Sequence, residues 1–293
     1  MMKFEGIMPA LITPLNEDQT VKLEVVDQLV EHLVAKGADG FYIGGATGEG
    51  INLKTEERMR LAERAVAKIG GRVPSIVQVA AYDFNDAIRL AKHAESIGAD
   101  AISATAPLFF SYDQNDIYNY YKKLAEAVHI PMMMYYNPAA GFQFTADFAA
   151  RVFEIDNVTA IKWTSSNFYD MLRLKDLTHG EMNVMNGPDE MLLMGLSAGA
   201  DGGIGSTYNF QLENIKAVYN AFKAGDVNAA RAAQTKADRI IYAHLRYKVI
   251  PVTKVILEAQ GFAVGNPTFP QKRYTPEEKV QIVREMRSAG LDI

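Results

Sequence analysis

The sequence predicts an α/β protein folded as a (β/α)8 TIM barrel with a C-terminal helical extension. Short apolar runs alternate with longer amphipathic stretches from the N-terminus to about residue 206, which is the layout of a parallel sheet covered by helices. The short runs number eight, the count that closes such a barrel. A glycine-containing motif also recurs between helices and strands, as expected for repeated units.

The eight apolar runs are the expected strands. They end near Thr13, Gly44, Val79, Ala104, Tyr135, Lys162, Asn186 and Gly205. Because the active site of a barrel of this type lies at the carboxyl ends of its strands, polar residues there are the first candidates for chemistry.

The stretches between the runs carry the helix pattern. Apolar Val26, Val30 and Leu33 recur at the spacing of one helix face, with charged residues elsewhere on the surface. The motif Gly-Ala-Asp precedes three expected strands, at residues 37–39, 98–100 and 199–201. Glycine fits the left-handed position that ends a helix, so three copies at equivalent places indicate repeated βα units.

After residue 206 the strand pattern stops. Helices are expected at about 211–224, 227–247, 250–260 and 276–289. The last begins Thr275-Pro276-Glu277-Glu278, a capping box with proline at the first helical position. We expect a single domain over residues 1–293, with the barrel in 1–225 and the helical extension in 226–293. No linker rich in Pro, Gly or Ser frees the extension, so it should pack on the barrel or lie in a subunit interface.

The composition excludes several classes of function. The 293 residues include 30 Lys and Arg against 35 Asp and Glu, a net charge of -5, and the lack of a long basic run argues against a nucleic-acid partner. There is no cysteine, so disulfides, thiolate catalysis and Cys-ligated metal sites are excluded. No apolar run reaches the roughly 18 residues of a membrane span, and residues 1–12 lack the pattern of a secretory leader. We expect a cytoplasmic protein without membrane attachment.

A glycine-rich loop, Gly44-Gly45-Ala46-Thr47-Gly48-Glu49-Gly50, follows the second expected strand. Its backbone N–H groups could converge on an anion. Its spacing matches neither the dinucleotide fingerprint nor the P-loop, and a purely structural turn explains the glycines equally well.

Lys162 and Tyr135 end two successive expected strands. At the mouth of a barrel, burial of Lys162 disfavours the ammonium and leaves an amine able to attack a carbonyl. A lysine that ends an apolar strand is otherwise a surface group whose chain snorkels to solvent. Tyr135 is either a catalyst or a packed rim residue, and its neighbour Tyr136 is the other tyrosine that could face the site.

Acidic and small residues follow the seventh and eighth strands. The segment Asn186-Gly187-Pro188-Asp189-Glu190 places two acids at a helix start. They either interact favourably with the helix dipole or accept hydrogen bonds from a polyol. The five histidines are scattered and show no metal-site spacing, so we expect neither a metal nor a cofactor.

Taken together, these segments resemble the N-acetylneuraminate lyase and dihydrodipicolinate synthase superfamily over essentially the whole chain. In that family a G-x-T-G-E loop holds the carboxylate of pyruvate or another 2-oxo acid, and residues 45–49 fit it. The family tyrosine lies three residues before a proline, matching Tyr135 before Pro138, and the Schiff-base lysine ends the sixth strand, matching Lys162. The resemblance implies a class I aldolase with Lys162 and Tyr135 as catalytic residues. It also implies substrate binding by Gly45, Ala46 and Thr47.

Three segments are very similar to the N-acetylneuraminate lyase branch: residues 162–164, 187–190 and 199–209. By that resemblance the sugar chain of the substrate would be bound by Thr164, Gly187, Asp189, Glu190, Gly205 and Ser206. The expected reaction is aldol cleavage of N-acetylneuraminate to N-acetylmannosamine and pyruvate through a lysine Schiff base. Dihydrodipicolinate synthases resemble one another in an arginine shortly after the tyrosine, and residues 138–141 offer none.

Two residues depart from the family pattern. Ala46 stands where many members have Ser or Thr, and Phe110 stands where many have a Tyr of the proton relay. The alternatives are therefore a related aldolase or dehydratase of another 2-oxo-3-deoxy sugar acid, dihydrodipicolinate synthase, and, from a different class, a non-catalytic sugar-acid sensor. The resemblance further implies a small-molecule 2-oxo acid as partner and a homo-oligomer, by family resemblance a tetramer.

Overall fold

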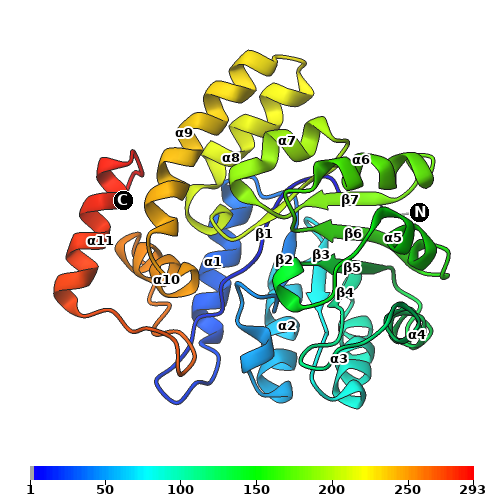
Figure 1. Ribbon diagram of the computed structural model, residues 1–293. Coiled ribbons are helices and arrows are strands. Elements are labelled where there is room, and N and C mark those ends of the chain that lie inside the picture. Colours follow the sequence, from blue (N-terminus) through cyan, green and yellow to red (C-terminus); the bar gives the residue numbers. More distant parts are fainter. Residues whose placement is uncertain (1–2) are drawn as a thin grey trace.

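The computed structural model describes residues 3–293 and contains an eight-stranded parallel sheet in which a helix follows each strand (Figure 1). The strands are β1 (Gly6–Pro9), β2 (Phe41–Ile43), β3 (Ser75–Gln78), β4 (Ala101–Thr105), β5 (Met132–Tyr136), β6 (Val158–Trp163), β7 (Asn183–Asn186) and β8 (Gly202–Gly205). Their order is β1-β8-β7-β6-β5-β4-β3-β2, and a parallel bridge from Ala10 to Tyr42 joins β1 to β2. The TIM barrel expected from the sequence is confirmed.

The helices surround the barrel and continue into a C-terminal extension. They are α1 (Leu23–Ala35), α2 (Thr55–Ile69), α3 (Phe84–Ser96), α4 (Gln114–Ala125), α5 (Ala146–Phe153), α6 (Phe168–Leu177), α7 (Leu192–Ser197), α8 (Tyr208–Lys223), α9 (Val227–Leu245), α10 (Val249–Ala259) and α11 (Pro276–Ser288). In Figure 1, α9, α10 and α11 gather on one side of the barrel. No helix within residues 3–293 is long and apolar enough to cross a membrane.

Two apolar layers hold the barrel together. One fills its interior, and the other lies between the strands and the surrounding helices. The interior layer consists of Phe4, Met8, Ala10, Tyr42, Ile76, Ala101, Met133, Tyr135, Ala160, Met185 and Ile204. Because side chains alternate between the two faces of a strand, a residue two positions from an interior residue also points inward. Lys162 follows Ala160 in this way.

The local signals at the helix ends are confirmed. Gly37, Gly98 and Gly199 adopt φ values of +83°, +80° and +94°, the left-handed region that glycine enters without steric cost. Thr275 and Glu278 form the expected reciprocal capping box at the start of α11. The repeated Gly-Ala-Asp motif therefore marks equivalent helix-to-strand turns.

The first strand is shorter than expected, because β1 ends at Pro9 and not near Thr13. Beyond Pro9 the backbone changes its hydrogen-bonding partner from β8 to β2. The amide of Ala10 donates to Gly205 O at 2.9 Å, but that of Leu11 donates to Tyr42 O at 2.9 Å. The next amide, Ile12, donates to the side chain of Asn209 at 3.1 Å. Regular pairing stops there because successive amides bond to different partners.

Hydrogen bonds join the extension to the barrel. Gln234 on α9 accepts a hydrogen bond from the amide of Leu193 on α7 at 3.0 Å. Gln260, at the end of α10, donates to the carbonyl of Phe210 on α8 at 3.0 Å. The expectation that the extension packs on the barrel is met by these contacts.

Candidate active site

A cavity of about 420 Å³ lies at the carboxyl ends of β6, β7 and β8. The loops that follow these strands supply its polar lining, and α9 and α10 contribute apolar residues. Five residues predicted to bind the substrate line it: Thr164, Gly187, Asp189, Glu190 and Ser206. Small-molecule sites typically measure roughly 300–1,000 Å³. The structure thus brings together residues that lie far apart in the sequence.

Lys162 and Tyr135 lie side by side. They are register partners in the β5–β6 pair, each one residue before the end of its strand. The Nζ atom of Lys162 lies 4.4 Å from the centre of the Tyr135 ring. Tyr135 belongs to the interior layer, whereas Tyr136 packs in the outer layer and stacks on Phe144 with 4.9 Å between ring centres. Of the two tyrosines, Tyr135 is the one beside the lysine.

The amine of Lys162 is not paired with a carboxylate. The residue is only 6% exposed, and no Asp or Glu oxygen within residues 3–293 lies within 4.0 Å of its Nζ. Its Nζ atom also lies 4.9 Å from the centre of the Tyr42 ring. The amine is therefore uncommitted to an ion pair at the mouth of the barrel.

Tyr42 is a residue of this cluster that sequence reasoning missed. Its hydroxyl donates to Ser103 Oγ at 3.0 Å, and its ring meets that of Tyr135 edge-on at 6.0 Å. Burial, with Tyr135 nearby, raises the pKa of Tyr42 well above its usual range, so the phenol stays protonated. Its strand is apolar on both faces, and such a run does not reveal which residues point inward.

The glycine-rich loop after β2 is a tight turn that closes on itself. The amide of Glu49 donates to Ala46 O at 3.0 Å, and that of Gly50 donates to Gly45 O at 3.1 Å. A Cβ on Gly50 would lie 1.9 Å from the carbonyl oxygen of Gly44, so only glycine fits.

The N–H groups in the middle of this turn are available for a ligand. Within residues 3–293, those of Ala46 and Thr47 donate to no protein acceptor. Consecutive free N–H groups in a turn form an anion-binding concavity. Ala46 is exposed and Thr47 is buried.

Asp189 is held by the loop after β8. One of its carboxylate oxygens accepts hydrogen bonds from the amide and hydroxyl of Thr207, each at 2.7 Å. The other lies against Gly205, where an added Cβ would come within 2.0 Å of it. Burial raises the pKa of Asp189 to about 6, although the Thr207 hydrogen bonds oppose the shift. Thr207 was not among the predicted residues because its role depends on this contact between loops.

His244 stands in the wall that α9 contributes to the cavity. Its Nε2 lies 2.9 Å from Thr253 Oγ1, and that hydroxyl donates to Val249 O at 2.8 Å. Burial lowers the pKa of His244 to about 4, so the ring is neutral near pH 7. The sequence marks it only as a histidine on a helix, because the residues it meets belong to the following helix.

Other predicted residues lie outside the cavity wall. Lys162, Tyr135, Gly205 and the loop residues Gly45, Ala46 and Thr47 are not part of its lining. Phe110 is 69% exposed and meets Phe109 edge-on at 5.1 Å. Within residues 3–293, no group of three or more His, Asp or Glu side chains is arranged to hold a metal ion.

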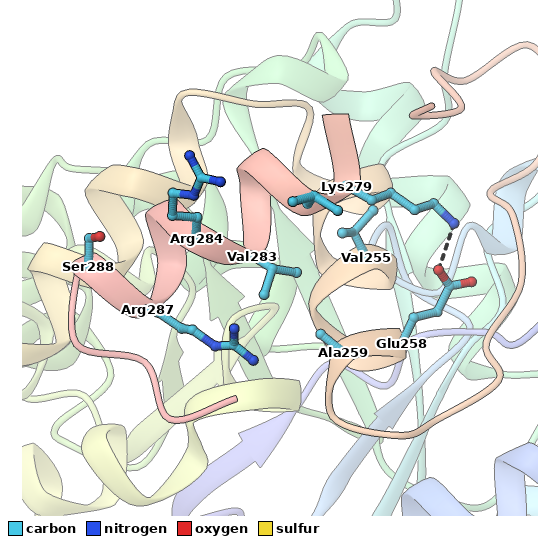
Figure 2. A pocket seen from close by; sticks show the side chains of 9 residues that line it. Val255, Glu258, Ala259, Lys279, Val283, Arg284, Arg287 and Ser288 are labelled. Atoms are coloured by element: carbon cyan, nitrogen blue, oxygen red, sulfur yellow. Dashed lines mark hydrogen bonds and ion pairs between the residues drawn. The ribbon is translucent and has the colours of Figure 1, made fainter. Parts of the chain in front are cut away.

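Figure 2 shows a larger groove, of about 600 Å³, between α10 and α11. Val255, Ala259 and Val283 form its apolar part, and Lys279 pairs with Glu258 at 2.7 Å at one end. None of the predicted site residues lines this groove. The cavity beside β6–β8, with its converging polar groups, is therefore the better candidate for a site.

Comparison with known proteins identifies relatives over nearly the whole chain. The model of the dihydrodipicolinate synthetase family matches residues 3–289. An N-acetylneuraminate lyase of Rhizobium meliloti is 33% identical over 284 residues, covering 97% of this chain and 94% of the relative. The structure of Proteus mirabilis N-acetylneuraminate lyase aligns with a TM-score of 0.94 at 29% identity, covering 99% of this chain and 100% of that one. A dihydrodipicolinate synthase of Bacillus anthracis aligns with a TM-score of 0.93 at 27% identity, covering 98% and 99%.

The raised pKa of Asp189 predicts a pH-dependent effect of Asp189→Asn. Between the ordinary value of 3.8 and about 6, the folded protein keeps a proton that the unfolded chain has released. The contribution of this carboxyl to stability therefore falls as the pH rises through that window. Asparagine does not titrate and can still accept both hydrogen bonds from Thr207. The variant should gain stability relative to the natural protein across the window, by up to about 3 kcal/mol.

Urea denaturation of both proteins, in parallel, across this pH window measures the effect. Because other titrating groups are shared, they cancel in the difference between the two free energies of unfolding. A difference that does not change with pH would contradict the raised pKa.

Proposed function

The chain belongs to the dihydrodipicolinate synthetase family and is a carbon–carbon lyase, and we propose that it cleaves N-acetylneuraminate to N-acetylmannosamine and pyruvate through an imine on Lys162. The observation that carries this proposal is the position of Lys162. It is a buried amine without a carboxylate partner, 4.4 Å from the Tyr135 ring. The cavity lined by Thr164, Asp189 and Glu190 lies at the same end of the barrel.

The proposed first step is addition of the neutral Lys162 amine to the C2 ketone of the open-chain sugar acid. Loss of water gives a protonated imine, in which the positive nitrogen withdraws electrons from the neighbouring carbon. Lys162 is suited to this step because no ion pair has to be broken before its amine attacks.

The second step breaks the C3–C4 bond. Tyr135 relays the proton from the C4 hydroxyl, the C4–O bond becomes a carbonyl, and the electrons of the C3–C4 bond move into the imine to give an enamine. N-acetylmannosamine leaves with the new aldehyde. Protonation of the enamine at C3 and hydrolysis of the imine then release pyruvate and restore Lys162.

We propose separate binding groups for the carboxylate and for the polyol chain of the substrate. We assign its carboxylate to the turn from Gly45 to Thr47, where the N–H groups of Ala46 and Thr47 are free. We assign the polyol chain to the lined cavity and to Gly205, which lies against Asp189. The residues proposed for the polyol are Thr164, Gly187, Asp189, Glu190, Gly205 and Ser206.

Another 2-oxo-3-deoxy sugar acid is the second candidate substrate, on the specific ground that Ala46 removes a hydroxyl from the carboxylate turn. A substrate panel that compares pyruvate release from several such acids distinguishes the two. The turn after Tyr136, Pro138–Ala140, carries no arginine, which supports a sugar-acid substrate over the dihydrodipicolinate synthase reaction.

We further propose a homo-oligomer, with a tetramer as the expectation from family resemblance. Phe109 and Phe110 are 87% and 69% exposed on the loop after β4, and clustered large apolar side chains on a surface mark contact sites. Light scattering should give a multiple of the monomer mass, and the double substitution Phe109→Ser/Phe110→Ser should lower it. A monomer for the unsubstituted protein would contradict the proposal. The cytoplasmic location stays a prediction from the sequence.

Turnover of N-acetylneuraminate tests the assigned roles of Lys162 and Tyr135. Lys162→Ala should lower the rate of pyruvate release about 10⁴-fold or more, because the covalent step is lost. Tyr135→Phe should lower kcat about 10²- to 10⁴-fold, because the proton relay is lost while the lysine remains.

Tyr136→Phe is the matched control, because that hydroxyl donates to Gln143 at 3.2 Å and its ring lies in the outer layer. It should retain activity within a few-fold. Retained turnover by Lys162→Ala, or equal losses in the two tyrosine variants, would contradict the assigned roles. A coupled assay for pyruvate measures all three.

A further inference from the structure

A buried ion pair joins the turn after β2 to the C-terminal extension. The Nζ atom of Lys254, on α10, lies 2.8 Å from Glu49 Oε1, and the two side chains are 2% and 1% exposed. Lys254 also donates to the carbonyl of Asn266 at 3.0 Å. This is the most deeply buried ion pair found within residues 3–293. It connects segments about 200 residues apart in the chain.

The second oxygen of Glu49 is held by the segment between α10 and α11. Glu49 Oε2 accepts a hydrogen bond from the amide of Thr268 at 2.6 Å and one from its hydroxyl at 2.7 Å. Gln271 donates to the same oxygen through its side-chain nitrogen. Asn52, just after the turn, donates to the Thr268 hydroxyl at 3.1 Å. The Glu49 carboxylate is therefore bound on both sides by the extension.

Glu49 belongs to the same turn as the free N–H groups and closes it. Glu49 has a left-handed backbone, with φ of +57°, a conformation that is unfavourable for residues other than glycine. Its amide donates to Ala46 O at 3.0 Å, which closes the turn containing the free N–H groups of Ala46 and Thr47. Movement of the Glu49 side chain would therefore move those groups.

Stability alone does not account for two buried charges. Removing an ion pair from water costs several kcal/mol per ion, and well-packed apolar residues of similar volume are often as stabilising. Burial lowers the pKa of Lys254, and Glu49 opposes that shift. The pair does, however, provide a fixed direction and distance that apolar contacts would not impose on the turn.

We propose that Lys254 and Thr268 are positioning residues for the substrate carboxylate, acting through Glu49 on the N–H groups of Ala46 and Thr47. The inference rests on the proposed function, because it assumes that a 2-oxo acid binds at this turn and forms an imine with Lys162. It makes the C-terminal extension a part of the carboxylate-binding site and not only a packing element. None of these extension residues need touch the substrate.

The test measures how much pyruvate is needed to form the imine. Borohydride delivers hydride to the imine carbon and converts the imine to a stable secondary amine, so mass spectrometry of the intact protein counts the fraction trapped. In Lys254→Met the pyruvate concentration for half-maximal trapping should rise about tenfold to a hundredfold, because the carboxylate donors are misplaced. Trapping at saturating pyruvate should remain, because Lys162 is unchanged.

Lys175→Met is the matched control. Lys175 pairs with Asp201 at 3.1 Å, with side chains 16% and 19% exposed, and Asp201 lies just before the start of β8, at the opposite end of the barrel. This variant should lose stability without changing the half-maximal pyruvate concentration. If Lys254→Met does not fold, Glu49→Gln/Lys254→Met replaces it, because that double variant leaves no unpaired buried charge. It should show the same rise.

The outcomes separate the two proposals. A natural protein that traps pyruvate, together with unchanged half-maximal concentrations in the Lys254 variants, would overturn the positioning role alone. An equal rise in Lys175→Met would also overturn it, because the effect would then follow from general destabilisation. A natural protein that gives no adduct would overturn the imine chemistry and this inference with it.

Discussion

The parallel register between β5 and β6 is the constraint on which the candidate site depends. It pairs Tyr135 with Lys162, and the alternation of side chains turns both toward the same side of the sheet. Barrel closure then makes that side an interior with little room for solvent. A shift of one residue in either strand would exchange Tyr135 for Tyr136, or Lys162 for Trp163, and would place a residue of the outer layer where the chemistry is proposed.

The C-terminal extension contributes to the same end of the barrel in two ways. Helices α9 and α10 supply part of the wall of the cavity that Thr164, Asp189 and Glu190 line. Helix α10 also carries Lys254, whose ion pair with Glu49 reaches the turn proposed to bind the carboxylate. The two proposed halves of the substrate site, carboxylate and polyol, thus both depend on helices outside the eight βα units.

The parts of the structure that were predictable from the sequence are those that rest on local pattern. The barrel follows from alternating apolar runs, and the turns follow from glycines such as Gly199. The residues that line the cavity were assigned instead from the family resemblance of the segments after the strands. Residues whose roles depend on contacts between distant segments were not predicted. The role of Tyr42 depends on which face of a fully apolar strand points inward. The role of Thr207 depends on the approach of two loops, and that of Lys254 depends on the packing of α10. The end of β1 was misplaced for the same reason, since its amides exchange partners between β8 and β2.

In the proposed mechanism the substrate becomes covalently bound to Lys162 and to no other lysine. Peptide mapping after borohydride reduction in the presence of pyruvate tests it most directly, because the reduced imine stays on the lysine that formed it. The added mass should lie on the peptide that contains Lys162, with all other lysine peptides unmodified. Modification of a different lysine, or of none, would contradict it.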